Sequence, residues 1–254
     1  MHDLVDSHSH IDVAAFAGDR DAAIARAHAA GVRRQIVPAI AAAGWGPLRA
    51  LCGARAGLHP AYGLHPMYIE EHRPDDLDAL AEWASDEDCV AIGECGLDFH
   101  VEGLDARAQR HYFLGQLELA RELGLPVIVH ARKAVDEVIA TLRRVGGLRG
   151  VVHSFSGSRE QAEHLWRLDF MLGIGGPVTY ERAQRLRGIV ASMPLEFLLL
   201  ETDSPDQPLA THRGERNEPA HLVDVLDCVA RLRNVDADMI ATATTRNAER
   251  LFGL

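Results

Sequence analysis

Short apolar runs alternate along this chain with longer segments of helical periodicity, and this alternation restricts the possible folds more than any other feature. Strands that are apolar along their whole length are typical of parallel sheets buried on both faces. Eight strand–helix units in 254 residues fit a closed (β/α)8 barrel, or TIM barrel, better than an open sheet. We therefore expect an α/β fold in which residues 1–254 form a single domain. The apolar runs lie at residues 4–8, 35–39, 61–65, 89–94, 126–130, 150–153, 170–174 and 197–201.

The segments between these runs have helical periodicity, and several carry recognisable ends. Ser158 and Gln161 have the spacing of a capping box, and Gly31 and Gly124 stand where left-handed C-caps are expected. The alternative fold is an open Rossmann-like sheet, but no G-x-G-x-x-G sequence follows the first strand. Helices are predicted at residues 19–30, 46–53, 74–85, 106–123, 134–145, 158–167, 180–192 and 218–232, and a final pair at 236–242 and 245–252.

The composition indicates a cytoplasmic globular protein. We find neither an apolar run of about 18 residues, as a membrane span requires, nor a signal peptide. The net charge of −11 argues against non-specific binding of nucleic acid over a large surface. It permits binding of a small phosphate-bearing substrate or of a strand end. The cysteines form no C-x-x-C pair and are expected to be reduced thiols: Cys52, Cys89, Cys95 and Cys228.

Metal-binding side chains stand at the ends of several predicted strands, where barrel enzymes place their sites. If residues 5–10 are extended, His8 and His10 point to the same face. A single histidine or carboxylate at a strand end is usually a packing or capping residue. Metal-binding side chains at many strand ends of the same barrel rim are much less expected by chance. We therefore predict a metal site with the ligands His8, His10, Glu94, His130, His153 and Asp203.

Six ligands exceed the three that a single catalytic zinc usually takes, which predicts two divalent metal ions about 3.5–4 Å apart. Glu94 is the expected bridge, and a carbamylated lysine is disfavoured because Lys133 is the only lysine. Nitrogen-rich ligation favours zinc, while manganese, nickel, cobalt or magnesium also fit such a site. Besides the shared Glu94, one ion is expected on His8, His10 and Asp203, and the other on His130 and His153.

A series of motifs occurs in a fixed order over residues 6–219: DSHSHID from Asp6, GLHP from Gly63, IGECGLD from Ile92, LPVIVHAR from Leu125, HSFSG from His153, LETDSP from Leu200 and RNEP from Arg216. In these motifs the chain resembles the TatD family of metal-dependent hydrolases, which belongs to the amidohydrolase-like barrels. The resemblance implies a (β/α)8 barrel, a divalent metal site and hydrolysis of phosphodiester bonds, typically in DNA. It implies the same six ligands and places His65 and Arg132 near the scissile phosphate.

We therefore predict a metal-dependent phosphodiesterase or deoxyribonuclease in which water shared by two metals is the nucleophile and Asp203 takes its proton. His65 and Arg132 are expected to contact the phosphate, although Arg132 has an alternative ion-pair partner in Asp136 and His65 an alternative packing role. The expected partner is a DNA strand end or a small phosphodiester. The protein is expected to be a monomer that does not associate with a membrane. The alternative is hydrolysis of another ester or amide, such as an aminoacyl ester. The ligand set and Asp203 argue against a non-catalytic metal-binding module.

The residues around this set have supporting roles in the prediction. Asp98 and Glu201 are expected to orient ligand histidines, Cys95 to be a buried structural thiol, and residues 206–216 to border the site. The remaining histidines are interpreted as surface or core residues: His2, His28, His59, His72, His100, His111, His164, His212 and His221.

Overall fold

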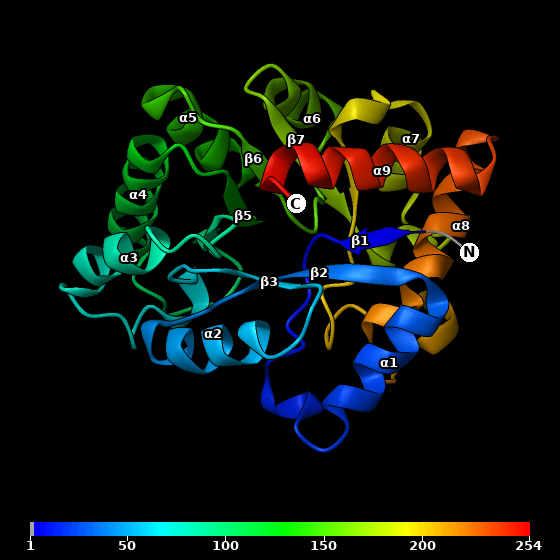
Figure 1. Cartoon of the computed structure of the whole chain (residues 1–254). Coiled ribbons are helices and arrows are strands. Elements are labelled where there is room, and N and C mark those ends of the chain that lie inside the picture. The colour runs from blue at the N-terminus through cyan, green and yellow to red at the C-terminus, as the bar shows by residue number, and fades with distance from the viewer. Residues whose placement is uncertain (1–2) are drawn as a thin grey trace.

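The computed structural model describes residues 3–254, so that the prediction for His2 falls outside the described residues. Its strands and helices alternate as a (β/α)8 barrel, which confirms the predicted fold (Figure 1). The strands pair in parallel and in chain order within a three-stranded and a five-stranded sheet. The strands are β1 (Leu4–Asp6), β2 (Val32–Pro38), β3 (Leu58–Ala61), β4 (Ile92–Asp98), β5 (Val127–Arg132), β6 (Gly150–Val152), β7 (Phe170–Ile174) and β8 (Leu198–Leu200).

Hydrogen bonds at two seams join the sheets into a closed ring. Between β3 and β4, a parallel bridge links Tyr62 to Ile92. Between β8 and β1, the Ser7 N–H donates to the Leu200 carbonyl at 3.0 Å. Beside it the buried Asp6 carboxylate accepts two hydrogen bonds from Thr202, one from the N–H at 2.9 Å and one from the hydroxyl at 2.6 Å. The first and last strands are therefore fixed to each other at the end where the site lies.

The helices cover the outside of the ring and have the predicted ends in most cases. Ser158 and Gln161 form the capping box, and Gly31 and Gly124 are left-handed C-caps. No helix within residues 3–254 is both long and apolar enough to cross a membrane. The helices are α1 (Arg20–Ala30), α2 (Trp45–Gly53), α3 (Asp76–Ala84), α4 (Ala106–Leu123), α5 (Val135–Val145), α6 (Arg159–Trp166), α7 (Gln184–Ser192), α8 (Leu222–Arg233) and α9 (Ala237–Phe252).

The C-terminal region is one helix, so the predicted pair of helices at 236–242 and 245–252 is wrong. Neither glycine nor proline interrupts this stretch, and threonines are only weakly unfavourable within a helix, so the helix continues through them. The Thr244 hydroxyl donates to the Ile240 carbonyl at 2.9 Å within the helix. Asp236 caps the helix by accepting the Asp238 N–H at 2.9 Å.

Helix α9 closes the end of the barrel opposite the site. Its residues Ala248, Leu251 and Phe252 pack against an apolar layer inside the ring, and Figure 1 shows the C-terminal end of α9 over the middle of that ring. The barrel is consequently open only at the carboxyl ends of its strands. The layer consists of Val5, Ile36, Ala61, Ala91, Ile128, Val151, Met171 and Leu199.

Two strands lie elsewhere than predicted. Strand β3 covers Leu58–Ala61 instead of 61–65, because Pro60 is tolerated within it: its carbonyl still accepts the Val90 N–H at 3.1 Å. Strand β4 continues to Asp98, so that Glu94 is an internal strand residue and not a terminal one. Gly96 permits this continuation, since a Cβ there would lie 2.0 Å from the His130 carbonyl oxygen of β5.

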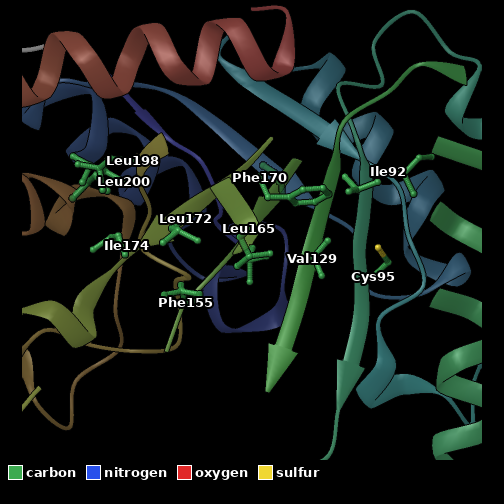
Figure 2. Packing of buried hydrophobic residues seen from close by; sticks show 14 of the residues in the cluster. Ile92, Cys95, Val129, Phe155, Leu165, Phe170, Leu172, Ile174, Leu198 and Leu200 are labelled. Carbon is green, nitrogen blue, oxygen red and sulfur yellow. The ribbon is translucent and has the colours of Figure 1, made fainter. Parts of the chain in front are cut away.

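The apolar core lies between the ring and the helices and includes Cys95. Figure 2 shows Cys95 on β4 among apolar side chains that include Ile92 and Val129. Its Sγ lies 3.6 Å from the Ile128 carbonyl oxygen, and burial raises the pKa of the thiol well above its ordinary value. Cys95 is therefore directed away from Glu94 and into the core. All four cysteines are buried free thiols.

Candidate metal centre

A cavity of about 1110 Å³ opens at the carboxyl ends of the strands, and most of the predicted site residues line it. The alternation of side chains along the strands explains part of this convergence. Ile128 points into the barrel, so His130, two residues further along β5, points the same way. The same relation holds for Val151 and His153. The predicted residues that line the cavity are His10, His65, Glu94, His130, Arg132, His153 and Asp203.

Glu94 is the centre of the cluster, and its two oxygens face different histidines. Oε2 lies 3.1 Å from His8 Nε2 and 3.4 Å from His10 Nε2. Oε1 lies 3.0 Å from His130 Nδ1 and 2.8 Å from His153 Nε2. The carboxylate thus separates the histidines into the two pairs that the sequence predicts for two metal ions, with one oxygen for each pair.

Asp203 faces the pair formed by His8 and His10. Its Oδ1 lies 3.6 Å from His8 Nε2 and 3.7 Å from His10 Nε2. The Asp203 backbone has a φ of 54°, and its N–H donates to the His8 carbonyl at 2.9 Å. The other oxygen, Oδ2, accepts a hydrogen bond from the Gln207 side-chain amide. The two carboxylate oxygens therefore have separate environments.

The donor atoms fit a metal ion better than they fit one another. His8 Nε2 lies 3.2 Å from His10 Nε2, and His130 Nδ1 lies 3.2 Å from His153 Nε2. In each pair two ring nitrogens converge with a carboxylate oxygen at the floor of the cavity. Imidazole and carboxylate together are typical ligands of zinc and related divalent ions. The arrangement therefore fits divalent cations within the cluster.

His65 belongs to the cluster but differs from the other histidines in its hydrogen bonding. Its Nε2 lies 2.9 Å from Glu94 Oε1, and both side chains are buried. His65 therefore lies within the cluster and not only at the substrate-facing surface of the cavity. Its Nδ1 accepts the Met67 N–H at 3.1 Å, and burial lowers the pKa of the ring to about 4. In the neutral ring the proton is therefore on Nε2, where it is directed at Glu94. His65, Glu94 and His130 also form a group whose donor atoms lie close enough together to hold a metal ion.

Asp98 and Glu201 lie behind the histidines, where the sequence places orienting residues. Asp98 Oδ2 lies 2.9 Å from His130 Nε2, on the side of the ring that faces away from Glu94. Glu201 Oε1 lies 3.9 Å from His153 Nδ1 and accepts the Ser154 N–H. Space for Glu201 depends on Gly173, because a Cβ there would lie 2.0 Å from Glu201 Oε2. Asp98 therefore holds a histidine directly, while Glu201 is further from its own.

The electrostatics of the cluster give its two carboxylates different properties. Burial alone would raise the pKa of Glu94, but the surrounding imidazoles hold that pKa well below its ordinary value. Glu94 is therefore ionised and available to cations. Burial raises the pKa of Asp203, an effect that His153 and His10 only partly oppose. Asp203 is consequently a stronger base than an exposed aspartate.

Arg132 stands at the end of β5 with its exposed side chain on the cavity wall. The ion pair with Asp136 that the sequence left open is not formed within residues 3–254, and Asp136 instead accepts a hydrogen bond from Gln161 Nε2 at 2.7 Å. The Arg132 guanidinium is thus available to an anion in the cavity.

Gln207 is a site residue that the sequence analysis does not single out. Its side-chain amide donates to both Asp203 Oδ2 and Ser154 Oγ, which connects the segments after β8 and β6. The residue lies within the polar stretch 206–216 that was expected to border the site, but no spacing or motif distinguishes it there. Only the three-dimensional contact with Asp203 reveals its place.

Comparisons with known proteins show which family and which structures the chain resembles. The profile of the family described as "TatD related DNase" matches residues 5–253. The chain is 40% identical over 254 residues to the "uncharacterized metal-dependent hydrolase YjjV" of Escherichia coli strain K12, which covers 99% of this chain and 98% of that protein. It is 36% identical to the "3'-5' ssDNA/RNA exonuclease TatD" of Citrobacter rodentium over 251 residues, with 94% of each chain covered.

Solved structures show the same likeness. The crystal structure of YjjV, described as a TatD homologue from Escherichia coli K12, superimposes with a TM-score of 0.95 at 38% identity and covers 99% of this chain and 98% of its own. A TatD family hydrolase from Entamoeba histolytica has a TM-score of 0.87 at 19% identity and covers 99% and 98%, which shows a shared fold.

Proposed function

The chain belongs to the TatD family of metal-dependent hydrolases, and we propose that it hydrolyses phosphodiester bonds at the ends of nucleic acid strands. The observation that carries this proposal is the position of Glu94, which offers one oxygen to His8 and His10 and the other to His130 and His153. A two-metal site of this kind suits displacement at phosphorus. The exonuclease name of the Citrobacter relative and the free Arg132 guanidinium in the cavity support a phosphate substrate.

We propose two divalent ions, with zinc as the first choice from the nitrogen-rich ligands and with manganese, nickel, cobalt or magnesium as alternatives. The proposed ligands are His8, His10, Glu94, His130, His153 and Asp203. When bound, these ions supply Lewis-acid activation of water and of the phosphoryl group. A cytoplasmic location belongs to the same proposal and is supported by the four free thiols.

The side chains of the cavity divide the remaining chemical tasks. Asp203 receives the proton of the attacking water, for which its raised pKa and the separate environment of its Oδ1 are suited. His65 contacts a non-bridging phosphate oxygen, toward which its Nε2–H would turn from Glu94 as negative charge develops there. Arg132 neutralises the same charge from the cavity wall. The phosphorus–oxygen bond to the leaving nucleoside oxygen then breaks, and this oxygen takes up the proton that Asp203 received, which gives a hydroxyl and a phosphate monoester.

The deciding experiment compares three substrates after chelation and return of one metal at a time. They are a single-stranded oligonucleotide, a chromogenic phosphodiester and an aminoacyl ester, each with magnesium, manganese or zinc. The proposal predicts turnover of the oligonucleotide with at least one metal. Turnover of the aminoacyl ester alone would contradict it and would favour hydrolysis of another ester at the same site.

A further inference from the structure

Two arginines of the cavity wall have no task in the reaction proposed above. Arg182 and Arg185 follow β7, at the start of α7, and both are exposed and line the cavity. Arg185 Nη2 donates to the Ser156 carbonyl at 2.7 Å, and the Arg182 guanidinium carbon lies 5.4 Å from the centre of the Tyr180 ring. These contacts fix the two side chains to the rim without neutralising their charge.

Among residues 3–254, Arg182 and Arg185 are two cavity-wall arginines without an acidic partner, unlike several arginines elsewhere on the protein. Within the part of the chain that the structure describes, neither Arg182 nor Arg185 forms an ion pair, whereas Arg216 binds Asp19 at 2.7 Å. The whole chain has a net charge of −11, so positive charge on this cavity wall contrasts in sign with the protein as a whole. Positive charge on the cavity wall consequently attracts an anion to this side of the site.

The ring topology gives these arginines a defined position relative to the opposite wall. In a closed ring of eight strands, β3 and β7 are four strands apart and therefore lie across the barrel from each other. Met67 and Tyr68 follow β3 and line the cavity, and Met67 is 40% exposed. A ligand that spans the opening would contact Met67 and Tyr68 on one side and Arg182 and Arg185 on the other. The Glu94 cluster lies between these two walls.

We infer that Arg182 and Arg185 hold a phosphate of the substrate other than the one that is cleaved. This inference rests on the proposed function and defines its substrate class as single-stranded nucleic acid with at least two phosphates. Arginine suits the task because its guanidinium matches the geometry of phosphate oxygens. Met67 and Tyr68 provide a surface for a base on the opposite side.

The test compares two substrates in enzyme loaded with the metal that gives turnover. One is a thymidine dinucleotide with a single phosphodiester and no terminal phosphate, and the other is a thymidine tetranucleotide. For R182A/R185A we expect KM for the tetranucleotide to rise roughly tenfold or more with little change in kcat, and a dinucleotide rate within about twofold of wild type. The salt dependence of the tetranucleotide reaction becomes shallower by about 0.7 in log–log slope for each phosphate that the arginines no longer neutralise.

The control is Arg167→Ala, which removes one positive charge at a side chain that is 70% exposed. Arg167 lies at the C-terminal end of α6, and helices of this fold run antiparallel to the strands, so it is at the closed end of the barrel. We expect its rates on both substrates to equal those of wild type. Equal losses on both substrates in R182A/R185A, or no loss on either, would overturn the inference.

If the protein does not hydrolyse phosphodiesters, the wild-type enzyme cleaves neither substrate, and this result differs from every outcome above. In that case binding of a fluorescent tetranucleotide to chelator-treated protein, measured by anisotropy, decides the inference. Weaker binding to R182A/R185A than to wild type and R167A supports the phosphate subsite. Identical binding to the three proteins refutes it.

Discussion

Asp98 holds His130 by the nitrogen that faces away from the cluster, with 2.9 Å between Asp98 Oδ2 and His130 Nε2. The other nitrogen of the same ring is thereby directed at Glu94, from which it is 3.0 Å away. Hydrogen bonds of this kind set the orientation and the basicity of a metal-binding histidine. Strand β4 supplies both carboxylates, so the continuation of this strand to Asp98 has a direct consequence for the site.

Asp98→Asn is expected to weaken metal binding roughly 10–100-fold, because the amide does not hold the imidazole as the carboxylate does. Asparagine keeps an oxygen for the His100 N–H, which Asp98 Oδ1 accepts at 2.8 Å, so the local fold is retained. Competition with a chromogenic chelator measures the affinity. Asp78→Asn, at an exposed position of α3, is the control for the loss of one charge. Unchanged affinity in Asp98→Asn would exclude the orienting role.

Asp203→Ala is expected to lower turnover by roughly 10²–10⁴-fold while the metal content stays largely intact, because Glu94 and its histidines remain. Elemental analysis after gel filtration and initial-rate measurements check the two parts separately. Asp206→Ala removes the same charge from the cavity wall and is expected to remain active. An active Asp203→Ala enzyme would remove this residue from the reaction.

Gln207→Leu is expected to lower kcat more than it changes KM, because Asp203 loses the donor that occupies its Oδ2. A hydrogen bond to a charged group contributes about 1.5–3 kcal/mol, which corresponds to roughly 10–100-fold in rate if it acts only in the transition state. Ser154→Ala removes the second partner of the Gln207 amide and leaves Asp203 in place, so its effect should be smaller. A larger effect of Ser154→Ala would argue against positioning through Gln207.

Gly96→Ala is expected to destabilise the fold by about 1–3 kcal/mol or more, because the new methyl group would displace β5 at His130. Urea denaturation followed by circular dichroism measures the free energy of unfolding. Gly188 offers a matched control within α7, where a Cβ meets nothing within 4 Å. Gly188→Ala should be neutral or stabilising by about 0.5–1 kcal/mol. Similar effects of the two variants would refute the close approach of β4 and β5.

Acid should weaken the attachment of α1 to the segment before α8. Hydrogen bonds from Arg216 and Arg26 hold the pKa of Asp19 below its ordinary value of 3.8. A carboxylate with a depressed pKa in the folded state stabilises that state above its unfolded pKa, and this contribution is lost as the pH falls below about 3.8. Asp19→Asn should therefore flatten the decline of unfolding free energy with falling pH in this range. An unchanged slope would contradict the assignment.

The fold could be predicted from the sequence because its signal is repeated eight times. Each apolar run is followed by a helical segment, so an error at one strand does not change the overall topology. The errors in the strands occur where backbone geometry and not hydropathy decides the boundary. Pro60 lies inside β3, and Gly96 allows β4 to pass close to β5. Neither effect is visible in an apolar pattern.

The candidate cluster could be assembled from the sequence because strand ends of a parallel barrel meet at one rim. His130 and His153 follow this rule directly. Residues whose roles depend on contacts between loops, such as Gln207 with Asp203, carry no periodic signal. The position of His65 beside Glu94 could likewise not be predicted from the sequence. The Met67 N–H that sets the His65 tautomer is a feature of the folded backbone. The ligand assignments themselves stay predictions until a metal is measured.

The seam between β8 and β1 makes the site a product of the complete chain. The Asp6 carboxylate and Thr202 are 196 positions apart, and the backbone bond from Asp203 to His8 spans a similar interval. Contacts this distant in sequence carry a large loop-closure entropy and are associated with slow folding. A nascent chain whose strand β8 has not yet been synthesised contains His8 and His10 but lacks Asp203, the base that faces them. The proposed site is therefore assembled only when β8 has paired with β1.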